Sequence, residues 1–173
     1  MTTHPCDVLP LVDGGKLIFN PCPGTQGVGL AESLAQLREA GAHAVISMTP
    51  SEELAKLEVA ALPEVVVQTG MRWFHLLIED DAAPGPAFEQ AWAANRDAVM
   101  ALLSQQGGIA IHCRGGSGRT GFMAALILRE MGMDGADADA LVRRLRPKAL
   151  TLPAHIDYLA ARDGRHPQQE QSQ

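Results

Sequence analysis

Residues 109–121 read IAIHCRGGSGRTG. The first three are apolar without alternation, which is typical of a parallel strand buried on both faces. Beyond the glycines, residues 122–128 are apolar on every side, which predicts a helix inside the core. A buried strand, a glycine-rich loop and a buried helix in succession form a unit of an α/β fold. We call residues 112–118 the cysteine loop.

Apolar runs and amphipathic periods alternate along the rest of the chain. Residues 8–12 and 16–19 flank Asp13-Gly14-Gly15 and predict a hairpin. Alternating strands and helices predict a three-layer α/β domain, in which a small, mostly parallel sheet is flanked by helices. Residues 1–163 are expected to form this single domain, and the polar residues 164–173 a disordered tail. We expect further strands at 43–48 and 72–78, and helices at 30–40, 51–60, 88–103, 135–146 and 153–162.

The composition narrows the class of protein. With 173 residues, 46% of them hydrophobic, the chain can bury one ordinary core. Its net charge of −6 argues against a nucleic-acid partner. That charge is uneven, because residues 1–110 carry five basic and 13 acidic side chains, whereas residues 111–173 carry nine and seven. The C-terminal third therefore suits an anionic ligand.

The sequence contains neither the pattern of a signal peptide nor that of a membrane helix, and this decides the expected cellular location of the protein. The first residues have no signal-peptide pattern, and no apolar run approaches the ~18 residues of a membrane helix. We therefore expect a cytoplasmic protein without a membrane partner, and a monomer as the default. Three scattered cysteines provide neither a disulfide framework nor a CxxC metal site. No metal and no other cofactor is expected.

The cysteine loop combines a nucleophile with an anion-binding backbone. Gly115, Gly116 and Gly118 let the chain turn tightly and direct successive N–H groups into one concavity. The helix that begins near Gly118 adds its positive end, and Arg119 can form a bidentate contact with phosphate-like oxygens. In such surroundings a cysteine such as Cys113 is suited to act as a nucleophile.

Two other glycine-loop types fit this stretch poorly. Residues 116–121 match GxGxxG, but a dinucleotide fold places that loop early in the chain, and an acidic residue at a strand end about 20 residues later is missing. A nucleotide-binding P-loop needs glycine at Cys113 and lysine at Arg119. The sequence therefore favours an anion-binding cysteine site.

His112-Cys113, five residues, then Arg119-Thr120 reproduces the HCx5R[S/T] motif, and the chain is identified by resemblance as a cysteine-dependent protein phosphatase. It is most similar to compact dual-specificity phosphatases of the cyclin-dependent-kinase-associated type. Weaker similarity extends over most of the chain, at Pro23-Gly24, at Glu79-Asp80-Asp81, and around Arg146 and Tyr158. The resemblance implies hydrolysis of phosphomonoesters without a metal.

The resemblance also assigns expected roles within the motif. Cys113 would attack phosphorus, Arg119 would bind the equatorial oxygens, and Thr120 would help the cysteine to leave in the second step. His112 would orient the loop through hydrogen bonds. The phosphate would be bound by the residues between nucleophile and clamp, which are Arg114, Gly115, Gly116, Ser117 and Gly118.

A general acid must protonate the departing oxygen, and the resemblance places it in the acidic loop, residues 79–86. In the similar subfamily the acid Asp precedes a proline by four positions, as Asp80 precedes Pro84, so Asp80 is favoured. Glu79 and Asp81 compete with it, Asp81 being the stronger of the two, and the remaining alternative is a surface acidic turn without a catalytic role.

Other polar residues have weaker assignments. Ungapped comparison places His155 where the family often has a glutamine that positions the hydrolytic water, although a plain surface role is equally consistent. Arg143, Arg144, Arg146 and Lys148 are expected to form one solvated basic face. Cys22 is a possible redox partner of Cys113.

We therefore predict a protein phosphatase, specific for tyrosine or of dual specificity. Its substrate would be a phosphoprotein or another phosphomonoester. One alternative is a regulatory module that binds phosphate without turnover, and a weaker one is a cysteine-loop sulfurtransferase. A module that only binds would need neither Cys113 nor Asp80.

Overall fold

The computed structural model describes residues 3–164 and, within them, one five-stranded sheet in the order β1-β2-β5-β3-β4. β1 runs antiparallel to β2, and all other neighbours are parallel. This confirms both the hairpin and the mostly parallel sheet. The strands are β1 (Asp7–Pro10), β2 (Lys16–Asn20), β3 (Ala42–Ser47), β4 (Arg72–His75) and β5 (Gly108–His112).

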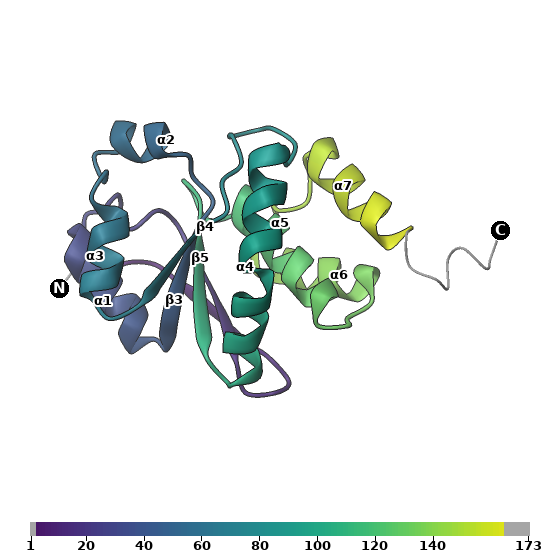
Figure 1. Cartoon of the computed structure of the whole chain (residues 1–173), viewed down its shortest axis with the longest axis horizontal. Coiled ribbons are helices and arrows are strands. Elements are labelled where there is room, and N and C mark those ends of the chain that lie inside the picture. The colour runs from purple at the N-terminus through teal and green to yellow at the C-terminus, as the bar shows by residue number, and fades with distance from the viewer. Residues whose placement is uncertain (1–2, 165–173) are drawn as a thin grey trace.

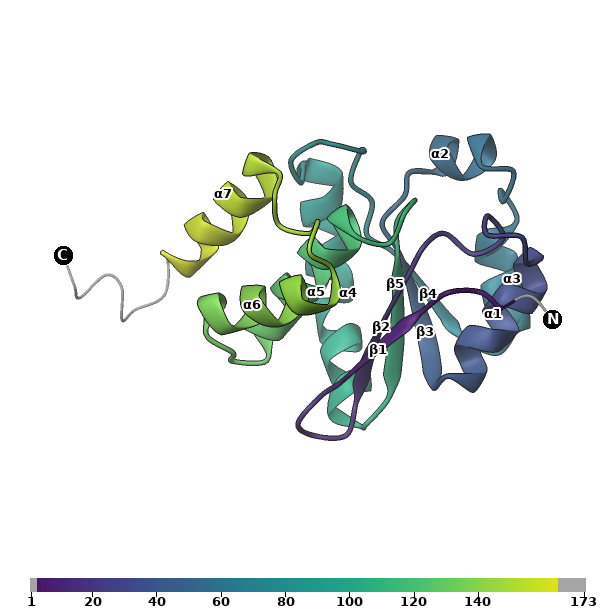
Figure 2. The same ribbon diagram turned by 180° about the vertical axis from the view of Figure 1, so that it is seen from behind.

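Helices cover both faces of the sheet and confirm the three-layer α/β architecture (Figure 1). On one face, α1 contacts β3 and α3 contacts β4; on the other, α4 and α5 contact β5. Figure 2 shows from behind that α6 and α7 lie beyond α5, on the side away from α1 and α3. The helices are α1 (Leu30–Glu39), α2 (Ser51–Lys56), α3 (Leu62–Gln68), α4 (Pro86–Ser104), α5 (Gly118–Glu130), α6 (Gly135–Leu145) and α7 (Pro153–Asp163).

The central strand β5 is buried on both faces, as its apolar run predicts. Ile109 and Ile111 pack into the core beneath α4 and α5, whereas Ala110 packs into the core beneath α1 and α3. Residues 122–128 of α5 are all buried, which confirms the expected internal helix. The cysteine loop therefore joins two fixed elements at the carboxyl edge of the sheet.

Several boundaries differ from the prediction. α3 was not predicted, because the β-branched run Val65-Val66-Val67 disfavours a helix by propensity, yet Leu62 and Val66 are buried against the core. α2 ends at Lys56, before the expected residue 60.

β4 ends at His75, three residues earlier than predicted, although the Leu76 N–H still donates to the carbonyl of Ser47 at the end of β3 and the Ile78 N–H to the carbonyl of Met48 just after it. Of the expected tail, Gly164 forms the C-cap of α7 and residues 165–173 lie outside the described residues. No helix in the described range has both the length and the apolarity needed to cross a bilayer.

Candidate active site

The cysteine loop begins at His112, the last residue of β5, and ends at Gly118, the first residue of α5. Gly116 has a φ of +85°, and a Cβ there would lie within 2.8 Å of backbone atoms of Asn20 and Pro21. Glycine is therefore required at this position by both conformation and packing. In contrast, a Cβ at Gly115 or Gly118 would meet nothing within 4 Å. These two glycines leave open space around the backbone at the mouth of the loop.

Cys113 is 3% exposed, and its sulfur accepts two hydrogen bonds, one from the cysteine loop and one from α5. The Gly116 N–H lies 3.3 Å from Sγ, and the Thr120 hydroxyl lies 3.2 Å from it. Both donors belong to the segment where α5 begins, so the positive end of that helix faces the sulfur. This environment suits a thiolate, the nucleophilic form of cysteine.

His112 is fully buried and links neighbouring strands to the backbone of Cys113. Its Nδ1 lies 3.0 Å from the Cys113 carbonyl oxygen, which can only accept, so Nδ1 carries the proton in this network. Nε2 then accepts from the Ser47 hydroxyl at 2.6 Å, and the Ser47 oxygen accepts from the Trp73 indole at 2.8 Å. Burial lowers the pKa of His112 to about 4, so the ring is neutral at neutral pH. Ser47 and Trp73 were not predicted as parts of this site.

Arg119 is buried and held in place by a carboxylate that sequence analysis missed. Its two terminal nitrogens donate to the two carboxylate oxygens of Glu53, at 2.8 and 2.7 Å. It also donates to the Ile78 carbonyl at 2.9 Å, and Asp80 Oδ1 lies 3.6 Å from Nη2. Glu53 lies in the first turn of α2, which follows β3 and reaches the same edge of the sheet as the cysteine loop.

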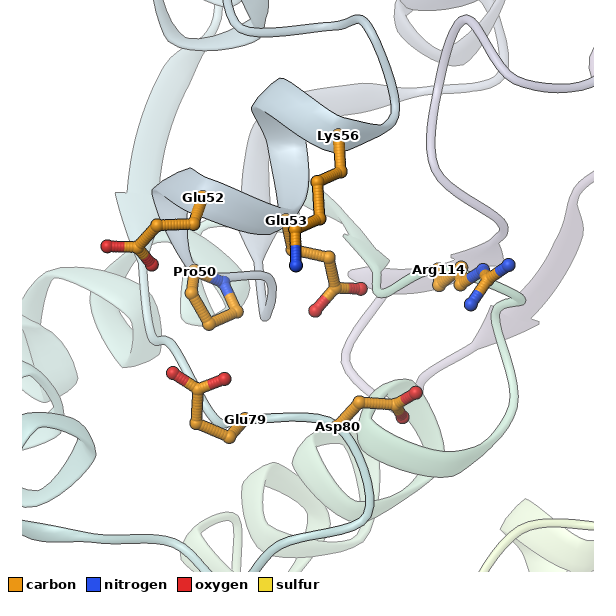
Figure 3. Close-up of a pocket in the computed structure, with 7 residues that line it drawn as sticks. All are labelled: Pro50, Glu52, Glu53, Lys56, Glu79, Asp80 and Arg114. Carbon is orange, nitrogen blue, oxygen red and sulfur yellow. The ribbon is translucent and has the colours of Figure 1, made fainter.

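A pocket of about 270 Å³ opens between α2 and the acidic loop (Figure 3). The Glu79 carboxylate is directed toward Pro50, whereas the Asp80 carboxylate is directed toward Arg114 across the pocket. Asp80 and Glu79 line it, together with Pro50, Glu52, Glu53, Lys56 and Arg114. Of the acid candidates, Asp80 is therefore brought beside Arg119 and the cysteine loop.

Asp81 differs from its neighbour in its backbone. It is exposed and has a φ of +57°, in the left-handed region, at a turn closed by a bond from the Ala82 N–H to the Glu79 carbonyl at 3.2 Å. Asp and Asn tolerate this conformation better than most residues. Asp81 thus has a conformational reason to be present that requires no chemistry.

His155 is not a surface residue. It is buried in the first turn of α7, and its Nε2 donates to the Ala82 carbonyl at 3.1 Å. Its ring packs on Phe122, with centroids 5.1 Å apart. Burial, with Arg119 nearby, lowers the pKa of His155. The structure therefore places His155 against the acidic loop.

The predicted solvated basic face is wrong for Arg146. Its Nε donates to the Gly116 carbonyl at 2.9 Å, and its Nη1 donates to Asp7 at 2.6 Å. Arg143, Arg144 and Lys148 are exposed, although Arg143 also donates to the Leu150 carbonyl at 2.9 Å. Arg146 thus holds the backbone of the cysteine loop at Gly116, the residue whose N–H donates to the Cys113 sulfur.

Cys22 lies close to the cysteine loop, and its N–H donates to the Arg114 carbonyl at 3.0 Å. Burial, with Glu53 and Cys113 nearby, raises the pKa of the Cys22 thiol to about 12. Cys22 and Cys113 are both free thiols, and a redox role for Cys22 stays a prediction.

The family of the chain follows from comparison with known families. The model of a family described as "Polymorphic toxin system, DSP-PTPase phosphatase" matches residues 24–133, which include the acidic loop and the cysteine loop. The chain belongs to this family. It is a cysteine-dependent phosphatase of the protein tyrosine and dual-specificity superfamily, and its family supports protein phosphatase activity. Arg146 and His155 lie beyond the matched range.

Solved structures share the fold at low sequence identity. Kinase-associated phosphatase, with its catalytic-site cysteine replaced by serine, has a TM-score of 0.81 at 20% identity, over 96% of this chain and 99% of that one. The active form of Tk-PTP has a TM-score of 0.68 at 23% identity, over 89% and 95% of the two chains. Human DUSP28 has a TM-score of 0.64 at 16% identity, over 94% and 95%. No curated protein sequence matched the chain.

Proposed function

We propose that this phosphatase hydrolyses phosphomonoesters of proteins through a cysteinyl-phosphate intermediate. The observation that carries the proposal is the convergence of three groups at one edge of the sheet. The Cys113 sulfur lies at the start of α5 with two donors directed at it, the Arg119 fork is fixed by Glu53, and the Asp80 carboxylate lies 3.6 Å from Arg119. A nucleophile, an oxyanion clamp and a proton donor are the groups that acyl-type and phosphoryl-type transfer require.

In the first step, the Cys113 thiolate attacks phosphorus and an S–P bond forms as the ester P–O bond breaks. Arg119 and the amides of residues 114–118 hold the equatorial oxygens, while Asp80 gives its proton to the departing oxygen. In the second step, the Asp80 carboxylate takes a proton from water, the water oxygen attacks phosphorus, and the S–P bond breaks. Thr120 donates to the departing sulfur, and inorganic phosphate leaves.

The substrate class rests on the resemblance and on the composition of the loop. Arg114 is the extra cation within residues 113–118, which contain no lysine, unlike the lysine-rich loops of phosphoinositide-directed relatives. Within the family we propose the kinase-associated type, supported by a shared fold over almost the full length of both chains. A cytoplasmic monomer is proposed from the sequence alone.

The test compares the native protein with the Cys113→Ser variant in the hydrolysis of a chromogenic aryl phosphate, in the presence of EDTA and a reductant. Activity lost in the variant, which still binds phosphate or vanadate, is the expected result. Comparable activity in C113S would overturn the mechanism. No activity in either protein, with vanadate bound, would favour the phosphate-binding module, and cyanide-dependent consumption of thiosulfate would favour the sulfurtransferase.

A further inference from the structure

The acidic loop is fastened to α7 by one buried side chain. His155 Nε2 lies 3.1 Å from the Ala82 carbonyl oxygen, two residues after Asp80. A carbonyl oxygen can only accept, so Nε2 carries the proton. This hydrogen bond joins α7 to the middle of the acidic loop.

The His155 ring is itself held rigidly. Phe122, fully buried in α5, packs against it with ring centroids 5.1 Å apart and planes tilted by 40°. Farther along α7, the Tyr158 hydroxyl donates to Glu89 at 2.6 Å, in the first turn of α4. α7 therefore contacts the chain at Ala82 and again where the acidic loop has passed into α4.

The loop needs such support because Asp80 is weakly held by its own surroundings. The Asp80 side chain is 56% exposed, and its contact with Arg119 is a 3.6 Å ion pair without hydrogen-bond geometry. A general acid must lie within hydrogen-bond reach of the leaving oxygen, so small displacements of its loop slow the reaction.

We propose that His155 is a positioning residue that holds the acidic loop, through the Ala82 carbonyl, with Asp80 directed at the cysteine loop. The inference rests on the proposed function and deepens it. It differs from the role that the resemblance implied, because an Nε2–H donated to Ala82 is not available to orient a water.

The experiment compares H155F, which keeps an aromatic ring without the donor, with H155Q, which keeps an N–H at similar reach. Y158F, on the same helix but bonded to α4, is the matched control. Each protein is assayed for kcat/KM on a nitrophenyl phosphate, on phenyl phosphate and on an alkyl phosphate, because the need for an acid grows with the pKa of the leaving group. Circular dichroism and thermal unfolding verify the fold, and H155N replaces H155F if that variant does not fold.

We expect H155F to lose about 10-fold or more on the two poor leaving groups and about 3-fold or less on the nitrophenyl ester. H155Q should recover most of the loss, and Y158F should follow the native protein on all three substrates. The double variant H155F/D80N should be no slower than D80N, because the residue acts through Asp80.

If D80N is slow selectively on the poor leaving groups, Asp80 stands as the general acid, and three results would then overturn only the inference about His155. The first is an H155F loss of kcat/KM that is equal on every substrate. The second is an H155F/D80N variant whose loss is the product of the two single losses. The third is a rapid-quench burst of phosphocysteine in H155F, which would indicate that His155 positions the hydrolytic water. A D80N loss independent of the leaving group would instead overturn the proposed acid, and the inference with it.

Discussion

Glu53 and Arg119 form a bidentate ion pair, in which the two terminal nitrogens of the guanidinium donate to the two carboxylate oxygens at 2.8 and 2.7 Å. Arg119 is 3% exposed, and burying a guanidinium without a counter-charge is costly. The pair fixes the plane of the guanidinium in the absence of phosphate and neutralises its buried charge.

Removal of Glu53 should leave Arg119 buried without its counter-charge. We expect E53A to lower the free energy of unfolding by about 3 kcal/mol. Inorganic phosphate should stabilise E53A more than the native protein, since the anion then supplies the missing charge. Urea unfolding with and without phosphate measures both effects. E52A, an exposed neighbour lining the same pocket, should change stability by less than about 0.5 kcal/mol; a similar loss in E52A would contradict the assignment.

The two adjacent aspartates should differ in their kinetic effect. We expect D80N to lower kcat/KM by about 10²- to 10⁴-fold on phenyl phosphate, because the proton donor is lost. D81N should stay within about 3-fold of the native enzyme, since Asn also tolerates the left-handed backbone at this position. Steady-state kinetics on both variants decide the matter, and the reverse order would assign the acid to Asp81.

Thr120 should act on the second step. Its hydroxyl donates to the sulfur at 3.2 Å, and hydrogen bonds to charged groups contribute about 1.5–3 kcal/mol. We expect T120V to lower kcat by about 10-fold or more and to accumulate phosphocysteine, while T120S behaves like the native protein. Rapid-quench bursts and mass spectrometry of the trapped intermediate provide the measurement. A slower T120V with no burst would place the effect in the first step.

His112 should make the fold sensitive to acid. Its folded pKa of about 4 lies below the unfolded value near 6.5. Above pH 6.5 both states are neutral and its contribution to stability is complete. Between pH 6.5 and 4 the His112 imidazole is protonated in the unfolded state but stays neutral in the native state. The free energy of unfolding therefore falls by about 3 kcal/mol over this range of pH.

The matched variant for this prediction is H112N, whose amide can still donate to the Cys113 carbonyl. The stability difference between the native protein and H112N should shrink by about 3 kcal/mol from pH 7 to pH 4, as measured by urea unfolding. Carboxylates and His155 titrate in both proteins and cancel in the difference. Parallel curves for the two proteins would mean that His112 does not carry the effect.

The nucleophile, the clamp and their fold context could be predicted from local sequence because they are contiguous. Cys113 lies in the cysteine loop and Arg119 follows that loop directly in the first turn of α5, and the left-handed backbone of Gly116 between them favours glycine. The apolar runs of β5 and α5 place that loop at the carboxyl edge of a parallel sheet. The existence of most helices and strands follows from the same periodicity, although their ends do not.

The supporting residues were decided by tertiary structure, because each depends on register between distant segments. Ser47 meets His112 since these residues are paired across the parallel strands β3 and β5. Glu53 meets Arg119 although 66 residues separate them, and in sequence it is merely one of two glutamates at a helix start. The sequence around Arg146 and His155 is likewise consistent with two surface residues. Only the packing of α6 and α7 brings Arg146 to the carbonyl of Gly116 and His155 to the carbonyl of Ala82. Local sequence determines backbone conformation and burial, whereas long-range packing determines which buried polar groups become partners.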